Sequence, residues 1–236
     1  MARNAHVTIS QMIKDRADPS PLIGTWFMPP ELVAVAEGDV AGLRRLVAQG
    51  CPWMEAAGRG SQWDVNELTP GGDTPLHMAA INGPVNGRVE MVKTLVQELG
   101  VDIELESARG STALHAAADM GLAEMVTVLL QLGADKEATK GGGTPLVEAA
   151  VGGYLETVKV LVEAGAHLEA RCPGGSTALH FAACAGKAEI IRVLVEAGAE
   201  LEAQAAHGWT PLHYAALMGV ADAVRQSWTG AGRAGG

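Results

Sequence analysis

A four-residue motif, Thr-Pro-Leu-His or a close variant of it, recurs five times along this chain of 236 residues. The copies are separated by 38, 32, 33 and 33 residues, and they begin at Thr74, Thr112, Thr144, Thr177 and Thr210. A nearly constant period with a repeated motif indicates stacked structural units, each packing on the next. We therefore expect an all-α solenoid, an architecture that presents one long surface and favours binding over catalysis.

Each motif predicts the start of a helix. The threonine hydroxyl can cap a helix N-terminus, and the next position tolerates proline because the amide at that position has no helical partner. In the copy at Thr177, Leu179 and Ala182 follow at helical spacing, and Gly186 is placed to end the helix.

A second helix is predicted in each unit by apolar residues at positions i, i+3 and i+4, which form one buried stripe. Helices of about ten residues are marginal alone, so stacking must supply most of their stability. The stripes are Leu43/Leu46/Val47, Val92/Leu95/Val96, Val126/Leu129/Leu130, Val158/Leu161/Val162 and Ile191/Leu194/Val195.

This pattern resembles the ankyrin repeat over residues 31–228, with five clear copies and a degenerate first copy that lacks the motif. The resemblance implies about six helix-turn-helix units, each followed by a projecting β-hairpin loop. The expected units are 31–62, 63–101, 102–134, 135–166, 167–199 and 200–228. We expect residues 1–30 to form an N-terminal extension that caps the first unit, and the Gly-rich residues 229–236 to be disordered.

The resemblance also implies that the motif histidine makes structural hydrogen bonds within and between units. This role falls on His77, His115, His180 and His213, whereas Val147 occupies the corresponding position in the third full copy. The junction at Val147 should therefore lack the polar link.

Insertions lengthen the first two units. About 12 surplus residues lie near 51–62, where a long loop is either functional or disordered. In the second unit, we expect residues 83–87 to lengthen the turn between the helices by four, with one more residue near 99–101.

Composition excludes several classes of function. A net charge of −10 argues against nucleic-acid binding, and no apolar run approaches the roughly 20 residues of a membrane span. The three cysteines are far apart, and the N-terminal segment has no apolar signal region. We expect a cytoplasmic monomer, with the nucleus as the other compartment.

The sequence favours no catalytic, cofactor or metal site. The motif histidines are about one repeat apart and show no HxxxH or HExxH spacing, and no cysteine has a base nearby in sequence.

In the family that the chain resembles, partners lie across the loop tips and the inner face of the first helices. The corresponding positions here are Ile81, Arg109, Met120, Arg171, His207, Trp209, Leu217 and Met218. Exposed methionines and aromatic residues are typical anchors of protein interfaces. For Leu217 and Met218, packing against the C-terminal end of the chain is an equal alternative.

Asn66 lies eight residues before Thr74, where the resemblance places a site of asparaginyl hydroxylation in some repeats. The other interpretation is an asparagine that stabilises a turn.

The leading functional interpretation is a non-enzymatic scaffold that binds another protein. The alternative is a regulatory or targeting segment of a larger enzyme or channel that continues beyond residue 236.

Overall fold

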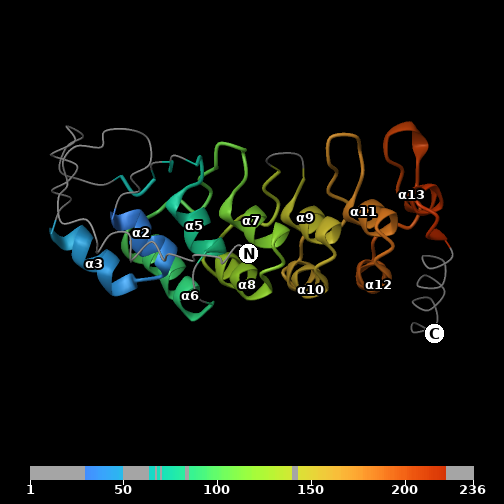
Figure 1. Ribbon diagram of the computed structural model, residues 1–236. Helices are drawn as coiled ribbons and strands as arrows, with labels where there is room; N and C mark the ends of the chain where they lie inside the picture. The colour runs from blue at the N-terminus through green and yellow to red at the C-terminus, as the bar shows by residue number, and fades with distance from the viewer. Residues whose placement is uncertain are drawn as a thin grey trace, which may run out of the picture.

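The computed structural model describes residues 30–49, 64–66, 68–69, 71–82, 85–139 and 143–221, with only the backbone described at 49 and 85–87. Within these residues the secondary structure is helical, and helices follow one another in pairs (Figure 1). The pairs are α2 (Pro30–Glu37) with α3 (Val40–Gln49), α5 (Pro75–Ile81) with α6 (Val85–Lys93) and the π-helix η1 (Thr94–Glu98), α7 (Ala113–Asp119) with α8 (Ala123–Gln131), α9 (Pro145–Gly152) with α10 (Leu155–Glu163), and α11 (Ala178–Cys184) with α12 (Ala188–Glu196), followed by the 3-10 helix η2 (Ala206–Gly208) and α13 (Pro211–Leu217).

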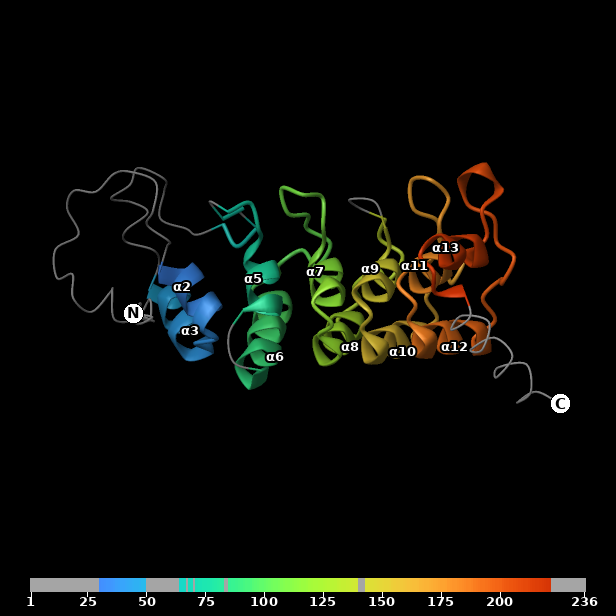
Figure 2. The ribbon, with the colours of Figure 1, turned by 45° about the vertical axis from the view of Figure 1, so that its right-hand side comes forward.

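The pairs stack into two rows, as Figure 2 shows. Each of the first helices α5, α7, α9, α11 and α13 contacts the next, and the second helices α6, α8, α10 and α12 contact one another likewise. The connecting loops project from the side of the first helices. This arrangement confirms the all-α solenoid predicted from the period.

The core lies between the two rows. The leucines of the first four motifs are almost fully buried, and the i, i+3 pairs of α6–η1, α8, α10 and α12, such as Val158 with Leu161, are completely so. Burying one such leucine stabilises the fold by about 2 kcal/mol. Paired alanines, as at Ala149 and Ala150, are also inaccessible, and their small side chains let neighbouring helices approach closely.

One predicted core residue is exposed. Val47 on α3 is 37% exposed, although Leu43 of the same stripe is fully buried. The reason is its place in the array, since α3 is the first of the second helices and has a described neighbour in that row on one side only.

Helix ends follow the predicted signals. The motif threonines adopt extended backbone at the N-cap, for example φ −85 and ψ 161 at Thr74, and Pro75 occupies the first helical position. Gly153 and Gly186 leave the first helices in the left-handed region, with φ of 80 and 62.

The insertion in the second unit takes a form that the sequence did not predict. Helix α6 begins at Val85, so the expected longer turn is wrong for residues 85–87, which add helix instead. The single further residue is absorbed just before 99–101, in the π-helix, where the amide of Leu99 donates to the carbonyl of Thr94 (3.1 Å). A π-turn accommodates one extra residue without ending the helix.

Four of the projecting loops are described as hairpins closed by a backbone hydrogen bond, such as Ser107 N to Ser111 O (2.8 Å). Among the described residues, backbone hydrogen bonds join neighbouring loops at two places, Ala108 N to Gly72 O (2.6 Å) and Ala206 N to Gly174 O (2.8 Å). These isolated bonds do not extend into a ladder, and the described residues contain no strand.

The first two helix pairs are also joined by an ion pair on the surface. Arg44 on α3 forms a forked contact with the carboxylate of Glu98, with Nε 2.9 Å from Oε2. Hydrogen bonding to this guanidinium lowers the pKa of Glu98.

Of the predicted cap at 1–30, residues 1–29 lie outside the described residues, as do the insertion at 51–62 and the tail at 229–236. None of the helices that are described is long and apolar enough to cross a membrane.

Candidate protein-binding surface

The motif threonine and histidine form one repeated link between units. In His77, His115, His180 and His213, Nδ1 lies 2.7 to 3.0 Å from the threonine Oγ1 of the same motif. For the first three, Nε2 reaches a carbonyl in the next loop, at Ser111 (2.7 Å), Gly143 (3.0 Å) and Trp209 (3.1 Å). The expected role within a unit is confirmed for all four histidines, and the role between units is confirmed for His77, His115 and His180.

The hydrogen bonds also define the protonation state of these rings. The backbone N–H of Thr177 donates to Nδ1 of His180 (3.1 Å), so Nε2 carries the proton and donates to the carbonyl of Trp209. Burial lowers the pKa of His180 and of His77 because it disfavours the imidazolium form. Both nitrogens of these neutral rings are engaged in structural bonds.

The junction at Val147 lacks this link, as predicted. The Thr144 hydroxyl is buried and has no hydrogen-bond partner among the described residues. Val147 and the thiol of Cys172 fill the space instead, because a Cβ built at Gly143 would lie 3.3 Å from one and 3.4 Å from the other. Burial raises the pKa of the Cys172 thiol, which disfavours the nucleophilic thiolate.

Asn66 belongs to a second series of links. Its Oδ1 accepts a hydrogen bond from the amide of Asp102 in the next unit (3.2 Å). Glutamate carboxylates bond the following unit's amide in the same way, at 2.8 Å, in the pairs Glu104–Asp135, Glu137–His167 and Glu169–Glu200. This geometry gives Asn66 a structural role, and its hydroxylation stays a prediction.

Exposed apolar side chains gather at the C-terminal ends of the first helices and at the turns that follow. We call these five residues the apolar row: Met120 (50% exposed), Val151 (47%), Tyr154 (37%), Leu217 (68%) and Met218 (57%). Three of them are among the predicted partner-binding residues. A fourth predicted residue of this kind, Ile81, is half-buried and packs against the core, so it contributes less surface.

Tyr154 was not singled out from the sequence. A Cβ built at Gly121 would lie 2.4 Å from its ring, and one at Gly152 would lie 2.2 Å away. The ring therefore rests on two glycines and bridges the ends of α7 and α9. The available signal was its position directly after a turn glycine, where the next two units have Lys187 and Val220.

The predicted partner-binding residues in the loops differ in their exposure and in the contacts that they already make within the chain. Trp209 is 39% exposed, and its ring packs edge-on against Tyr214 with centroids 5.8 Å apart. Arg171 is exposed, but its Nη1 donates to the carbonyls of Gly175 and Gln204, so it ties two loops together. Arg109 and His207 are exposed, and His207 adopts an unusual φ of 64.

The acidic residue Glu148 lies beside the apolar row and was also missed. It follows the third full motif, at a position that holds Met78, Ala116, Phe181 or Tyr214 in the other copies. Burial raises the pKa of its carboxyl, and the neighbouring Asp119 raises it further.

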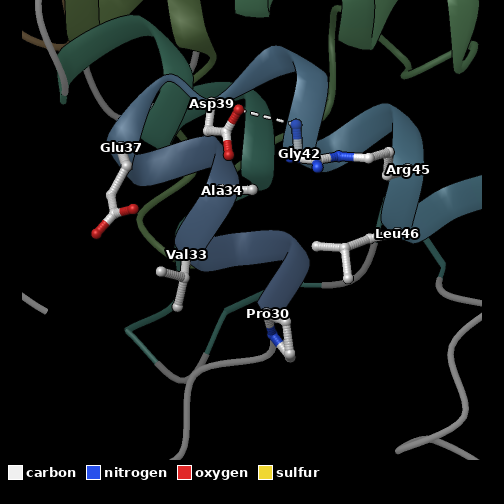
Figure 3. A pocket seen from close by; sticks show the side chains of 8 residues that line it. All are labelled: Pro30, Val33, Ala34, Glu37, Asp39, Gly42, Arg45 and Leu46. Carbon is white, nitrogen blue, oxygen red and sulfur yellow. Dashed lines mark hydrogen bonds between the residues drawn. The ribbon is translucent and has the colours of Figure 1, made fainter. Parts of the chain in front are cut away.

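A hollow of about 350 Å³ lies at the other end of the array, against α2 and α3 (Figure 3). It is lined by Val33, Leu46, Glu37 and Arg45 among others, and its Asp39 carboxylate already accepts the Gly42 amide (2.8 Å). Across the described part of the chain, no group of three potential metal ligands occurs.

Several known proteins are similar to part of this chain. It is 39% identical to Notch-regulated ankyrin repeat-containing protein A of Danio rerio over 69 residues, which are 29% of this chain and 57% of that protein. It is 39% identical to human protein phosphatase 1 regulatory subunit 27 over 72 residues, 30% of this chain and 44% of that protein. It is 38% identical to FYVE zinc finger domain protein UPA1 of Mycosarcoma maydis over 69 residues, 29% of this chain and 5% of that protein. The chain thus spans less than two thirds of each of these relatives.

A family model for ankyrin repeats matches the chain in three overlapping copies, at residues 32–140, 85–172 and 146–226. These matches cover most of the sequence and coincide with the stacked helix pairs and their threonine–histidine links. The chain belongs to the ankyrin-repeat family.

Proposed function

We propose that this chain is a non-catalytic module that binds another protein across the first-helix face and the tips of the projecting loops. The observation that carries the proposal is the apolar row. Its side chains are 37% to 68% exposed although they stand on well-packed helices. Large exposed apolar side chains that recur along one face of a packed domain indicate a candidate protein interaction site.

The rigidity of the surface supports the proposal. The row is built on helix ends whose backbones are fixed by buried neighbours, so little conformational entropy is lost when a partner binds. The family also supports a binding role, because ankyrin repeats are generally protein interaction modules. Three of the motif histidines, which first suggest catalysis, are instead engaged in links between units.

A second candidate is a regulatory or targeting segment of a longer protein. It is favoured by two relatives, because one is a regulatory subunit and in another the similar segment makes up 5% of the protein. The sequence of the full-length transcript distinguishes the two candidates. We further propose that the protein is monomeric and cytoplasmic. We also propose that its partner is a protein rather than a nucleic acid, because the chain carries a net charge of −10.

The test is affinity capture from host lysate with a triple variant, Met120→Ala, Leu217→Ala and Met218→Ala. Removing three anchors should reduce recovery of the bound partner at least about tenfold, since a few buried anchors carry most binding energy. Val47→Ala serves as the control because Val47 is a similarly exposed apolar residue on α3, away from the row. Unchanged recovery by a triple variant with wild-type circular dichroism would refute the proposal.

A further inference from the structure

A compact part of the first-helix face combines apolar and acidic side chains. We call Asp119, Met120, Glu148, Val151 and Tyr154 the mixed patch. Asp119 ends α7 and Met120 follows it, while Glu148 and Val151 are three residues apart on α9 and therefore share one helix face. The Tyr154 ring joins the two helix ends because it rests on Gly121 and Gly152.

The apolar side of the mixed patch offers a site for one large side chain. Met120, Val151 and Tyr154 are 50%, 47% and 37% exposed, and they come from two adjacent units. Gly121 and Gly152 have no side chains, so the tyrosine ring occupies the space over both of them. A methionine, an aromatic ring and a valine together form an adaptable apolar surface.

The acidic side of the mixed patch carries two carboxylates, near which His115 has a minor favourable charge interaction with Glu148. Glu148 is half-buried, and both its burial and the charge of Asp119 raise its pKa. Among the described residues, neither carboxylate forms an ion pair with a lysine or arginine. A partner's cation would relieve the repulsion between the carboxylates and replace the hydration that Glu148 has lost.

A lysine marks the opposite border of the mixed patch. The side chain of Lys187 lies over Gly153, where a built Cβ would be 2.6 Å from its Cε. Carboxylates on α7 and α9 and a lysine beside the turn after α9 therefore border the same patch. A bound segment whose positive charge lies near the carboxylates also avoids repulsion from Lys187.

We infer that the mixed patch binds a protein segment in which a large apolar residue lies beside a lysine or arginine. The apolar side chain contacts Met120, Val151 and Tyr154, and the cation lies between Asp119 and Glu148. The inference rests on the proposed function and specifies the partner's chemistry. The chain's net charge of −10 adds a general attraction for basic segments.

The experiment selects binding segments from a random pool of peptides. A random linear peptide library on phage is panned against the full chain, and the most enriched peptide is synthesised with a fluorescent label. Its Kd is measured by fluorescence anisotropy for the wild type and for two double variants, Met120→Ser with Val151→Ser and Asp119→Asn with Glu148→Gln. The controls are Val47→Ser on α3 and Glu163→Gln on α10, which change the same kinds of residue outside the mixed patch.

The expected peptides contain a large apolar residue beside a lysine or arginine. Loss of the two apolar side chains should raise Kd at least about tenfold, as expected for interface anchors. Loss of the two charges should raise Kd about three- to tenfold at low salt, with a smaller effect at high salt because ions screen the attraction. The two control variants should leave Kd unchanged.

Three results would overturn the inference. One is the enrichment of no peptide, or of peptides without a basic residue. Another is binding that neither double variant weakens. In that second case, the triple variant Met120→Ala, Leu217→Ala and Met218→Ala separates the two proposals. If this triple variant loses peptide binding or capture of the host partner, the proposed function survives while this inference falls. The third is a wild-type dimer in analytical ultracentrifugation that Met120→Ser with Val151→Ser dissociates, since a second copy would then occupy the mixed patch.

Discussion

Replacing His180 with alanine is expected to lower the free energy of unfolding by about 3 kcal/mol. The ring is fully buried, and its two nitrogens join Thr177 to the carbonyl of Trp209 in the next loop. The variant leaves the Thr177 amide and that carbonyl without these partners, and it opens a cavity between two units. Urea denaturation followed by circular dichroism measures the change.

Two threonine variants separate the hydrogen bonds from the packing. Thr177→Val removes a hydroxyl that contacts the His180 ring, whereas Thr144→Val removes a buried hydroxyl that has no partner in the described structure. We expect Thr177→Val to cost about 1–2 kcal/mol, and Thr144→Val to be neutral or slightly stabilising. Equal costs at both positions would show that the link contributes little.

Replacing Gly121 with alanine is expected to destabilise the fold by about 2–3 kcal/mol. Gly121 has a φ of +69, which an L side chain adopts only with strain, and its new Cβ would meet the Tyr154 ring at 2.4 Å. The matched control is Gly100→Ala, because Gly100 has a φ of +68 but nothing within 4 Å of a built Cβ. The control should lose only about 1 kcal/mol, the cost of the backbone conformation.

The contact with Tyr154 is isolated by a double-mutant cycle. In a Tyr154→Ala background, Gly121→Ala should cost no more than Gly100→Ala does, since the ring no longer obstructs the new methyl group. If Gly121→Ala still costs more stability than Gly100→Ala when the Tyr154 ring is absent, the strain does not come from the contact with that ring. Thermal unfolding followed by circular dichroism measures the stability of all four proteins of the cycle and of the Gly100→Ala control.

The sequence predicts most of the scaffold because its signals are local. A threonine that caps a helix and a glycine that ends it are read within a few residues, as Thr177 and Gly186 illustrate. The missing link at Val147 was also predictable, since a valine cannot replace the hydrogen bonds of histidine. Repetition then identifies these signals several times over.

Features that depend on the neighbouring unit could not be predicted in the same way. The sequence shows five extra residues in the second unit, but it does not show that α6 begins as early as Val85 or that Thr94–Glu98 forms a π-helix. The place of the Tyr154 ring depends on Gly121, which belongs to the preceding unit. Arg171 resembles a free loop cation in the sequence, although two carbonyls engage it in the structure.

In the candidate surface too, some features follow from the repeat pattern and others depend on the neighbouring unit. Exposure at Met120, Leu217 and Met218 follows from the repeat pattern and is found in the structure. Ile81 occupies an equivalent position, but it packs against the core and is half-buried. The acidic pair of Glu148 and Asp119 becomes visible only when α7 and α9 are placed side by side.

The central claim is that the first-helix face is where a partner protein binds. Its most direct test is photo-cross-linking in host cells, with benzoylphenylalanine in place of Met120 and, as the control, in place of Val47 on α3. The account predicts a discrete cross-linked protein from position 120 and none from position 47. No adduct from position 120, or the same adducts from both positions, would contradict it.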